Sequence, residues 1–262
     1  MFAFDPFNIL AALVVTVTIQ GLFFVYAATN RTDKVTDFAY SFNFLVLALL
    51  GLFANRAFAP VQVLSALAVT LWSLRLGGYL FMRILKIGKD PRFNNRREDT
   101  VKFLGFWILQ AAAVWLIMMP VTVVTSMKNL PPLPGWAWIG LVLWAGGLVI
   151  EAVSDNQKFR FKSNHENRGR WIESGLWKYS RHPNYFGETL LWWGLYLFNL
   201  PYLTGWLHFA VIGPVFITIL LLFVSGIPLL EQSANEKFGQ DPLYQEYKKR
   251  TSLFLLLPPR RG

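Results

Sequence analysis

Long apolar runs separated by short polar segments dominate the sequence. An apolar run of about 17–25 residues can cross a hydrocarbon core about 30 Å thick. Seven runs have about that length, which predicts an all-α fold, a single domain over residues 1–262 that crosses a membrane seven times. The predicted spans are roughly residues 8–28, 38–54, 60–85, 103–126, 135–153, 184–200 and 206–230.

The composition agrees with a membrane protein. Of the 262 residues, 54% are hydrophobic and 15% are charged, whereas a soluble domain is about 25% charged. No basic residue precedes the first apolar run, so we interpret that run as a span and not as a signal peptide. The absence of cysteine excludes disulfides, thiolate nucleophiles and cysteine-bound metals.

Basic residues are concentrated in alternate loops, and this asymmetry predicts the orientation. The first, third and fifth loops and the tail are rich in lysine and arginine, whereas the other loops contain only Arg56 and Lys128. Because cytoplasmic loops carry the excess of positive charge, we expect an external N-terminus and a cytoplasmic C-terminus. The basic residues of the third loop include Lys89, Arg92, Arg96 and Arg97.

The net charge of +10 therefore indicates contact with membrane lipids that have anionic headgroups. Nucleic acid is not an expected partner, because no nucleic-acid-binding module is recognisable.

Candidate chemistry lies in the fifth loop and at the start of the sixth span. Asp155, Phe159 and Lys162 recur at spacings of four and three, which places them on one helix face if the fifth span continues into the cytosol. Arg181 and His182 directly precede Pro183. A proline suits the first turn of a helix, and the exposed amides of that turn favour an anion.

Glu188 follows in an apolar run, where an ionisable residue is a functional candidate by default. Together with the loop it predicts a mainly cationic pocket that opens to the cytosol and suits a phosphorylated ligand. The alternative is that the bases form only a solvated cytoplasmic loop.

Two motifs resemble those of a known membrane superfamily. Residues 175–188, GLWKYSRHPNYFGE, resemble the signature shared by steroid 5α-reductases, sterol reductases and isoprenylcysteine carboxyl methyltransferases. Residues 231–248, EQSANEKFGQDPLYQEYK, look like the closing motif of that superfamily. The chain is most similar to a bacterial branch with a steroid 5α-reductase-like C-terminal domain, which implies a bacterial inner membrane. The similarity is specific from about residue 144 to the end.

The resemblance implies a buried NADPH held by the cytosolic ends of the last helices, in a cofactor-binding half of about residues 144–262. Arg75, in LWSLRLGGY at 71–79, matches a third-span arginine on the same cofactor. Arg181, His182 and Glu231 match the motif common to the superfamily, whichever cofactor it serves. The other residues that the resemblance assigns to the cofactor are Asp155, Lys162, Arg170, Tyr179, Asn184, Tyr185, Glu188 and Tyr247.

The sequence departs from the steroid enzymes at the catalytic end. Those enzymes use a Gln-Glu pair and a tyrosine to polarise an enone carbonyl, but the first hundred residues contain no such pair, and Trp72 occupies the tyrosine position. Asp37 falls close to the carboxylate position, and Tyr40 shares its helix face. They are candidates for the catalytic acid. Alternatively, Asp33 or Asp37 caps the second span, since aspartate is a favoured N-cap.

These observations predict an NADPH-dependent reductase of a polarised carbon–carbon double bond in a hydrophobic, steroid- or lipid-like substrate that enters from the bilayer. The first alternative is a methyltransferase that uses S-adenosylmethionine in the same pocket, and the second is a non-enzymatic lipid-binding protein. Lys162 and Arg170 favour NADPH, because the methyl donor lacks the extra phosphates. No metal is expected, because the chain has only three histidines and no cysteine. No Rossmann glycine motif is present either.

Overall fold

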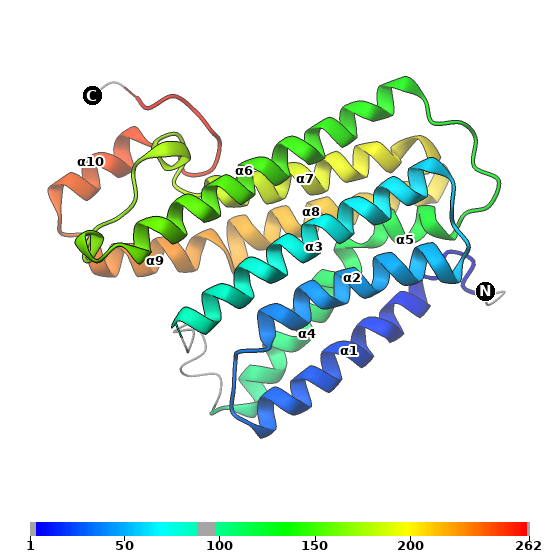
Figure 1. Ribbon diagram of the computed structural model, residues 1–262, viewed down its shortest axis with the longest axis horizontal. Helices are drawn as coiled ribbons and strands as arrows, with labels where there is room; N and C mark the ends of the chain where they lie inside the picture. Colours follow the sequence, from blue (N-terminus) through cyan, green and yellow to red (C-terminus); the bar gives the residue numbers. More distant parts are fainter. Residues whose placement is uncertain (1–3, 88–97, 261–262) are drawn as a thin grey trace. The chain divides into compact units, whose positions relative to one another are not determined.

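The computed structural model describes residues 4–87 and 98–260, and in this part of the chain every regular element is a helix (Figure 1). Lys89, Arg92, Arg96 and Arg97 of the third loop, and Arg261 of the tail, lie outside the described residues. The α-helices are α1 (Ile9–Thr29), α2 (Thr36–Ala54), α3 (Pro60–Ile87), α4 (Thr100–Ile117), α5 (Met119–Ser126), α6 (Trp138–Ser163), α7 (Pro183–Asn199), α8 (Ile212–Ile219), α9 (Ile227–Phe238) and α10 (Pro242–Arg250).

Six described stretches are long and apolar enough to cross a membrane, and they correspond to the first five and the seventh predicted spans. The prediction of an all-helical membrane protein is therefore confirmed. The sixth predicted span is α7, which has 17 residues. At a rise of about 1.5 Å per residue it is about 26 Å long, somewhat shorter than the hydrocarbon core. The six stretches are Ile9–Thr29, Thr36–Ala54, Pro60–Lys86, Thr100–Ile117, Gly135–Ser163 and Gly205–Phe238.

The fourth predicted span, 103–126, is wrong as a single helix. The structure divides it at Met118 into α4 and α5. Pro120 has no amide hydrogen and cannot donate to the carbonyl of Leu116, so the regular hydrogen-bond pattern stops there. A Cβ atom on Gly213 would lie 2.9 Å from that carbonyl oxygen, so the chain at Gly213 packs closely against the break.

The seventh predicted span, 206–230, is likewise not one helix. It consists of a 3-10 segment (Gly205–Val211), α8, a π-helical turn (Leu220–Val224) and the start of α9. The amide of Ser225 donates to the carbonyl of Leu220 at 2.9 Å, which is the five-residue step of a π-turn. Pro228, in the first turn of α9, cannot donate to the last carbonyl of that turn. The proline therefore accounts for the break before α9.

The chain forms two compact units. Unit 1 contains Met1–Gly140 and Leu195–Gly213, and unit 2 contains Leu141–Gly194 and Pro214–Gly262. The predicted cofactor-binding half, about 144–262, is thus divided: residues 195–213 belong to unit 1 and the remainder to unit 2.

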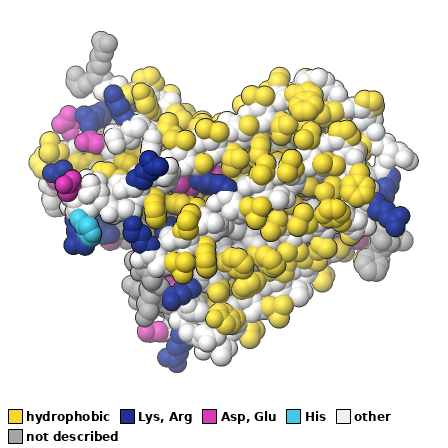
Figure 2. All heavy atoms as spheres, in the orientation of Figure 1, with side chains coloured by type: hydrophobic (Ala, Val, Ile, Leu, Met, Phe, Trp, Pro, Cys, Tyr) yellow, Lys and Arg dark blue, Asp and Glu magenta, His cyan; other side chains and the backbone are white. Residues whose placement is uncertain are grey.

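Unit 1 packs α1 against α2 and α4 through apolar side chains and a few buried amides. The side-chain amide of Gln110 donates to Oε1 of Gln20 at 2.9 Å and to the carbonyl of Thr36 at 3.2 Å. Asp5 accepts the amides of Ile9 and Ala11 and so satisfies the free donors of the first turn of α1. Figure 2 shows hydrophobic side chains over the outer face of α1 to α3, as expected for a surface in contact with lipid.

In unit 2, α6 and α7 approach each other so closely that only glycine fits at the crossing. A Cβ atom on Gly147 would lie 2.6 Å from the carbonyl oxygen of Gly187 and 2.6 Å from the amide of Leu191. A Cβ atom on Gly187 would lie 2.6 Å from the amide of Glu151. Small residues allow such backbone contact in membrane helices, where apolar burial does not drive association.

Gly147→Ala should therefore destabilise the protein, because the new methyl group meets backbone atoms that cannot move independently. Overpacking of this kind costs about 1–3 kcal/mol or more. Gly146→Ala is the matched control: it changes the neighbouring residue of the same helix, where a Cβ atom has nothing within 4 Å. The measurement is the melting temperature of each variant in one detergent. Equal melting temperatures for the two variants would contradict the close crossing.

Candidate functional site

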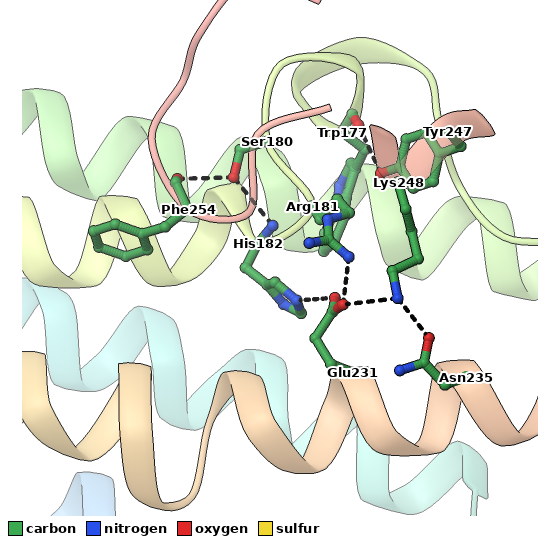
Figure 3. Close-up of polar contacts among 9 residues, drawn as sticks. All are labelled: Trp177, Ser180, Arg181, His182, Glu231, Asn235, Tyr247, Lys248 and Phe254. Carbon is green, nitrogen blue, oxygen red and sulfur yellow. Dashed lines mark hydrogen bonds and ion pairs between the residues drawn. The ribbon is translucent and has the colours of Figure 1, made fainter. Parts of the chain in front are cut away.

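Glu231 of α9 is the centre of the main charged cluster in unit 2 (Figure 3). Its Oε2 forms an ion pair with the guanidinium of Arg181, and its Oε1 lies 2.8 Å from Nε2 of His182. The ammonium of Lys248 is 4.0 Å from Oε2 and donates to the side-chain oxygen of Asn235 at 2.7 Å. The cluster thus joins α9, α10 and the segment before α7.

The C-terminal segment, residues 251–260, positions the two basic residues before α7. The amide of Arg181 donates to the carbonyl of Ser252 at 2.8 Å, and the hydroxyl of Ser180 donates to the carbonyl of Phe254 at 2.8 Å. The same hydroxyl accepts the amide of His182 at 3.1 Å. Ser180 therefore links the chain terminus to the backbone of His182.

Aromatic rings enclose the cluster. The ring of Tyr185 stacks on that of His182 with centroids 5.9 Å apart, and the ammonium of Lys158 lies 4.5 Å from the centroid of the Trp177 ring. The hydroxyl of Tyr247 donates to the carbonyl of Trp177 at 2.9 Å. Burial raises the pKa of the Tyr247 hydroxyl well above its usual range, so it remains a donor.

The electrostatic environment keeps the imidazole of His182 neutral near pH 7. Burial lowers the pKa of His182 below 6.5, and the nearby charges of Lys158 and Arg181 lower it further, although the hydrogen bond to Glu231 opposes this. With the carboxylate as acceptor, Nε2 carries the proton and Nδ1 is left as an acceptor. We assign this tautomer from the hydrogen bond.

Several buried polar atoms of residues 181–189, a stretch that includes two members of the cluster, have no hydrogen-bond partner in the described part of the protein. They are Nδ1 of His182, Nε of Arg181, Oδ1 of Asn184 and Oγ1 of Thr189. Buried polar groups are nearly always satisfied in folded proteins, by protein, water or ligand. The two acceptors and the cationic donor among them, on His182, Asn184 and Arg181, therefore require water or a polar ligand as a partner.

The chain matches a family described as "Protein of unknown function (DUF1295)" over residues 23–251. It belongs to this family. The matched region includes the Arg181–His182–Glu231 cluster and Lys248, and it ends just before the rest of the C-terminal segment. The chain is also 27% identical over 264 residues to "Uncharacterized protein C594.04c" of the yeast Schizosaccharomyces pombe, a match that covers 86% of this chain and 72% of the relative. No solved structure matches the chain.

In this member of the family, unit 2 contains eleven of the predicted cofactor residues, and they are not all in the cluster. Arg181, His182, Tyr185 and Glu231 contact one another as described. Asp155 on α6 and Glu188 on α7 are also buried, whereas Lys162, Arg170 and Tyr179 are exposed. Lys158, Ser180 and Lys248 belong to the cluster but were not among the predicted site residues. Ser180 and Lys248 lie within the two recognised motifs, which is the signal that could have identified them, whereas Lys158 lies outside both motifs.

The remaining predicted residues, Asp37, Tyr40 and Arg75, belong to unit 1. Asp37 forms an ion pair with Arg83 at 3.2 Å. The N-cap residue of α2 is Val35, so neither aspartate occupies the N-cap position. The ring of Tyr40 meets that of Phe44 edge to face, and the guanidinium of Arg75 lies 5.7 Å from the ring centroid of Tyr79.

The lowered pKa of His182 predicts a specific loss of stability in acid. In the unfolded chain His182 takes up a proton near pH 6.5, whereas the folded protein resists protonation there. Its contribution is thus fully present above about pH 6.5 and is lost as the pH falls through the lower folded-state pKa. Relative to His182→Gln, which stays neutral, the wild type should lose free energy of unfolding by up to about 1.4 kcal/mol per pH unit. Its melting temperature should therefore fall further in acid than that of the variant.

The measurement is the melting temperature of both proteins between about pH 7.5 and about pH 5. If the melting temperature of the wild type instead rises relative to that of the variant as the pH falls, His182 is protonated in the folded protein. The hydrogen bond to Glu231 would then outweigh the effect of burial on its pKa.

Proposed function

We propose that the protein is an NADPH-dependent reductase of a polarised carbon–carbon double bond in a hydrophobic substrate that enters from the lipid. The observation that supports this best is the cationic cluster of unit 2 with its unpartnered buried atoms. The likeness of both motifs to steroid 5α-reductases and sterol reductases supports the same assignment.

The residues of unit 2 fit a dinucleotide chemically. Arg181, Lys248 and Lys158 are positively charged side chains, and guanidinium and ammonium groups bind phosphate well. Nδ1 of His182 and Oδ1 of Asn184 are acceptors without partners, and they suit the hydroxyl or amide donors of a nucleotide. The bound cofactor would supply the hydride, and the protein would supply orientation and charge.

The proposed acid is Asp37 with Tyr40. A carboxylate that is ion-paired with Arg83 is not itself a proton donor, so Asp37 would have to release this pair in order to act. By the resemblance of the sequence, Arg75 remains a proposed cofactor contact.

The alternative is transfer of a methyl group from S-adenosylmethionine. Lys162 and Arg170, the charges that favour NADPH in the sequence, have exposed side chains. Lys158 and Lys248 supply positive charge to the cluster instead. A binding measurement with each cofactor is therefore needed to distinguish the two functions. If neither binds, the reading as a non-enzymatic lipid-binding protein is favoured.

Asn184→Leu should separate binding from folding. Removing an unpartnered buried oxygen should leave the melting temperature unchanged or raise it, because an unsatisfied polar group is costly. It should nevertheless weaken NADPH binding about tenfold or more, which equals about 1.4 kcal/mol. The measurement is an NADPH titration by calorimetry in detergent, with S-adenosylmethionine titrated in parallel.

Asn156→Leu is the control, since Asn156 is an exposed asparagine of α6. It should bind NADPH as the wild type does. Equal affinity of Asn184→Leu and wild type would remove Asn184 from the site, and binding of S-adenosylmethionine alone would establish the methyltransferase alternative.

We also propose that α7 crosses the membrane, giving seven spans, an external N-terminus and a cytoplasmic C-terminus, in a bacterial inner membrane. The chain has no cysteine, so a single introduced cysteine reports its own location. Lys128→Cys and Thr204→Cys should react with an impermeant maleimide in intact cells, whereas Arg168→Cys should react only after permeabilisation. If Thr204→Cys is protected, α7 does not cross and the C-terminus lies outside.

A further inference from the structure

The C-terminal segment exposes several apolar side chains. Leu253, Leu255 and Leu257 are 41%, 49% and 48% exposed, while the intervening Phe254 and Leu256 are half-buried. The segment bends at residues 253–255 and closes a tight turn in which the amide of Leu257 donates to the carbonyl of Leu255 at 2.9 Å. The ring of Tyr179, beside the segment, is also exposed. Three leucines and a tyrosine thus form one apolar row.

Backbone contacts hold this row at the start of α7. The amide of Leu257 donates to the carbonyl of Tyr179 at 3.2 Å, and the ring of Phe254 lies 5.6 Å from that of Phe186. Phe186 is in the first turn of α7. In the proposed topology, this turn enters the membrane from the cytosol. The row is therefore level with the boundary between lipid and water, where exposed leucine and tyrosine side chains are favoured.

Basic residues flank the row. Lys178 precedes Tyr179, Lys249 lies at the end of α10, and Arg260 follows the row and is bound through its amide to the carbonyl of Arg250 at 2.9 Å. All three side chains are exposed, and none forms an ion pair with another described residue. Arg250, by contrast, pairs with Glu173. Unpaired cations beside an apolar row complement an anionic headgroup above acyl chains.

We propose that residues 252–260, with Lys178 and Tyr179, bind anionic phospholipid in the cytoplasmic leaflet. The proposal rests on α7 entering the membrane from the cytosol but not on the reaction. Because the same segment holds Ser180 and Arg181 by hydrogen bonds, lipid binding also stabilises the backbone that presents His182 and Arg181 to Glu231. The occupant is a lipid and not a second copy of the chain, because a second copy would bring the same positive charges together.

The first test locates the row. A fluorophore on Leu255→Cys, in nanodiscs, should be quenched by lipids brominated near the headgroup and protected from aqueous iodide. The same fluorophore on Glu246→Cys, an exposed polar position of α10, is the aqueous reference. Quenching of the Leu255→Cys probe by iodide alone would overturn the proposal, and the probe needs no substrate or cofactor.

The second test determines whether the bound lipid is anionic. The wild type should melt at a higher temperature in phosphatidylglycerol nanodiscs than in phosphatidylcholine nanodiscs. Lys178→Gln, Lys249→Gln and Arg260→Gln together should abolish this shift, and Leu253→Ser with Leu257→Ser should reduce it. Leu243→Ser, which changes an exposed leucine of α10 outside the row, should retain it.

An unchanged shift in the glutamine variant would overturn the proposal. A second result would also overturn the proposal: a wild type that is a dimer and a Leu253→Ser, Leu257→Ser variant that is a monomer with an unchanged lipid-dependent shift. The row would then be a contact between two copies of the chain. The labelling of Thr204→Cys tests the topology separately. The NADPH titration tests the proposed reaction, so failure of either is distinguishable from failure of lipid binding.

Discussion

The carboxylate of Glu231 is the interaction on which the organisation of unit 2 depends. Arg181 and His182 precede one helix, Glu231 lies in the next long span, and Lys248 comes from the terminal helix, yet all meet at this group. Charges removed from water are tolerated only when they are paired, and loss of one partner leaves the others uncompensated at a cost of about 3–5 kcal/mol. Segments far apart in the chain are therefore held to one arrangement by a single acidic side chain.

The position of Glu231 depends in turn on a break in the last apolar stretch. The π-turn, Gly226 and Pro228 interrupt the helix, and α9 starts four residues before Glu231. A Cβ atom on Gly226 would lie 2.4 Å from the carbonyl of Leu221, so the turn also requires a glycine. Such π-turns are often found at functional sites. Here the turn ends the apolar part of the stretch and begins the part that carries the charged cluster.

In the proposed topology, the C-terminal segment connects the site with the membrane surface. Its carbonyl groups face Ser180 and Arg181, while its leucines face outward. The same short segment thus combines backbone hydrogen bonds to the site with exposed apolar side chains. A site that is held by a segment at the lipid boundary can respond to the lipid without any change in its own residues.

Local sequence was sufficient to predict much of the molecule. Apolar runs of sufficient length predicted the membrane class and the location of the long helices, because the requirement to satisfy backbone groups in lipid leaves a helix as the solution for each run. The two motifs likewise identified Arg181, His182 and Glu231, because these side chains lie in short, recognisable runs.

Long-range packing decided the rest. The hydropathy pattern did not predict the helix breaks at Met118 and Ser225. It is averaged over the length of a span, and the breaks are caused by single prolines. Spacing placed Lys162 with Asp155, but only Asp155 is buried, since a helix that extends beyond its neighbours exposes its last turns. The glycine contact of Gly147 with Gly187 and the return of the C-terminal segment to Ser180 join residues distant in the chain. Their sequences contain no local signal of the partner, so only the tertiary structure determines these contacts.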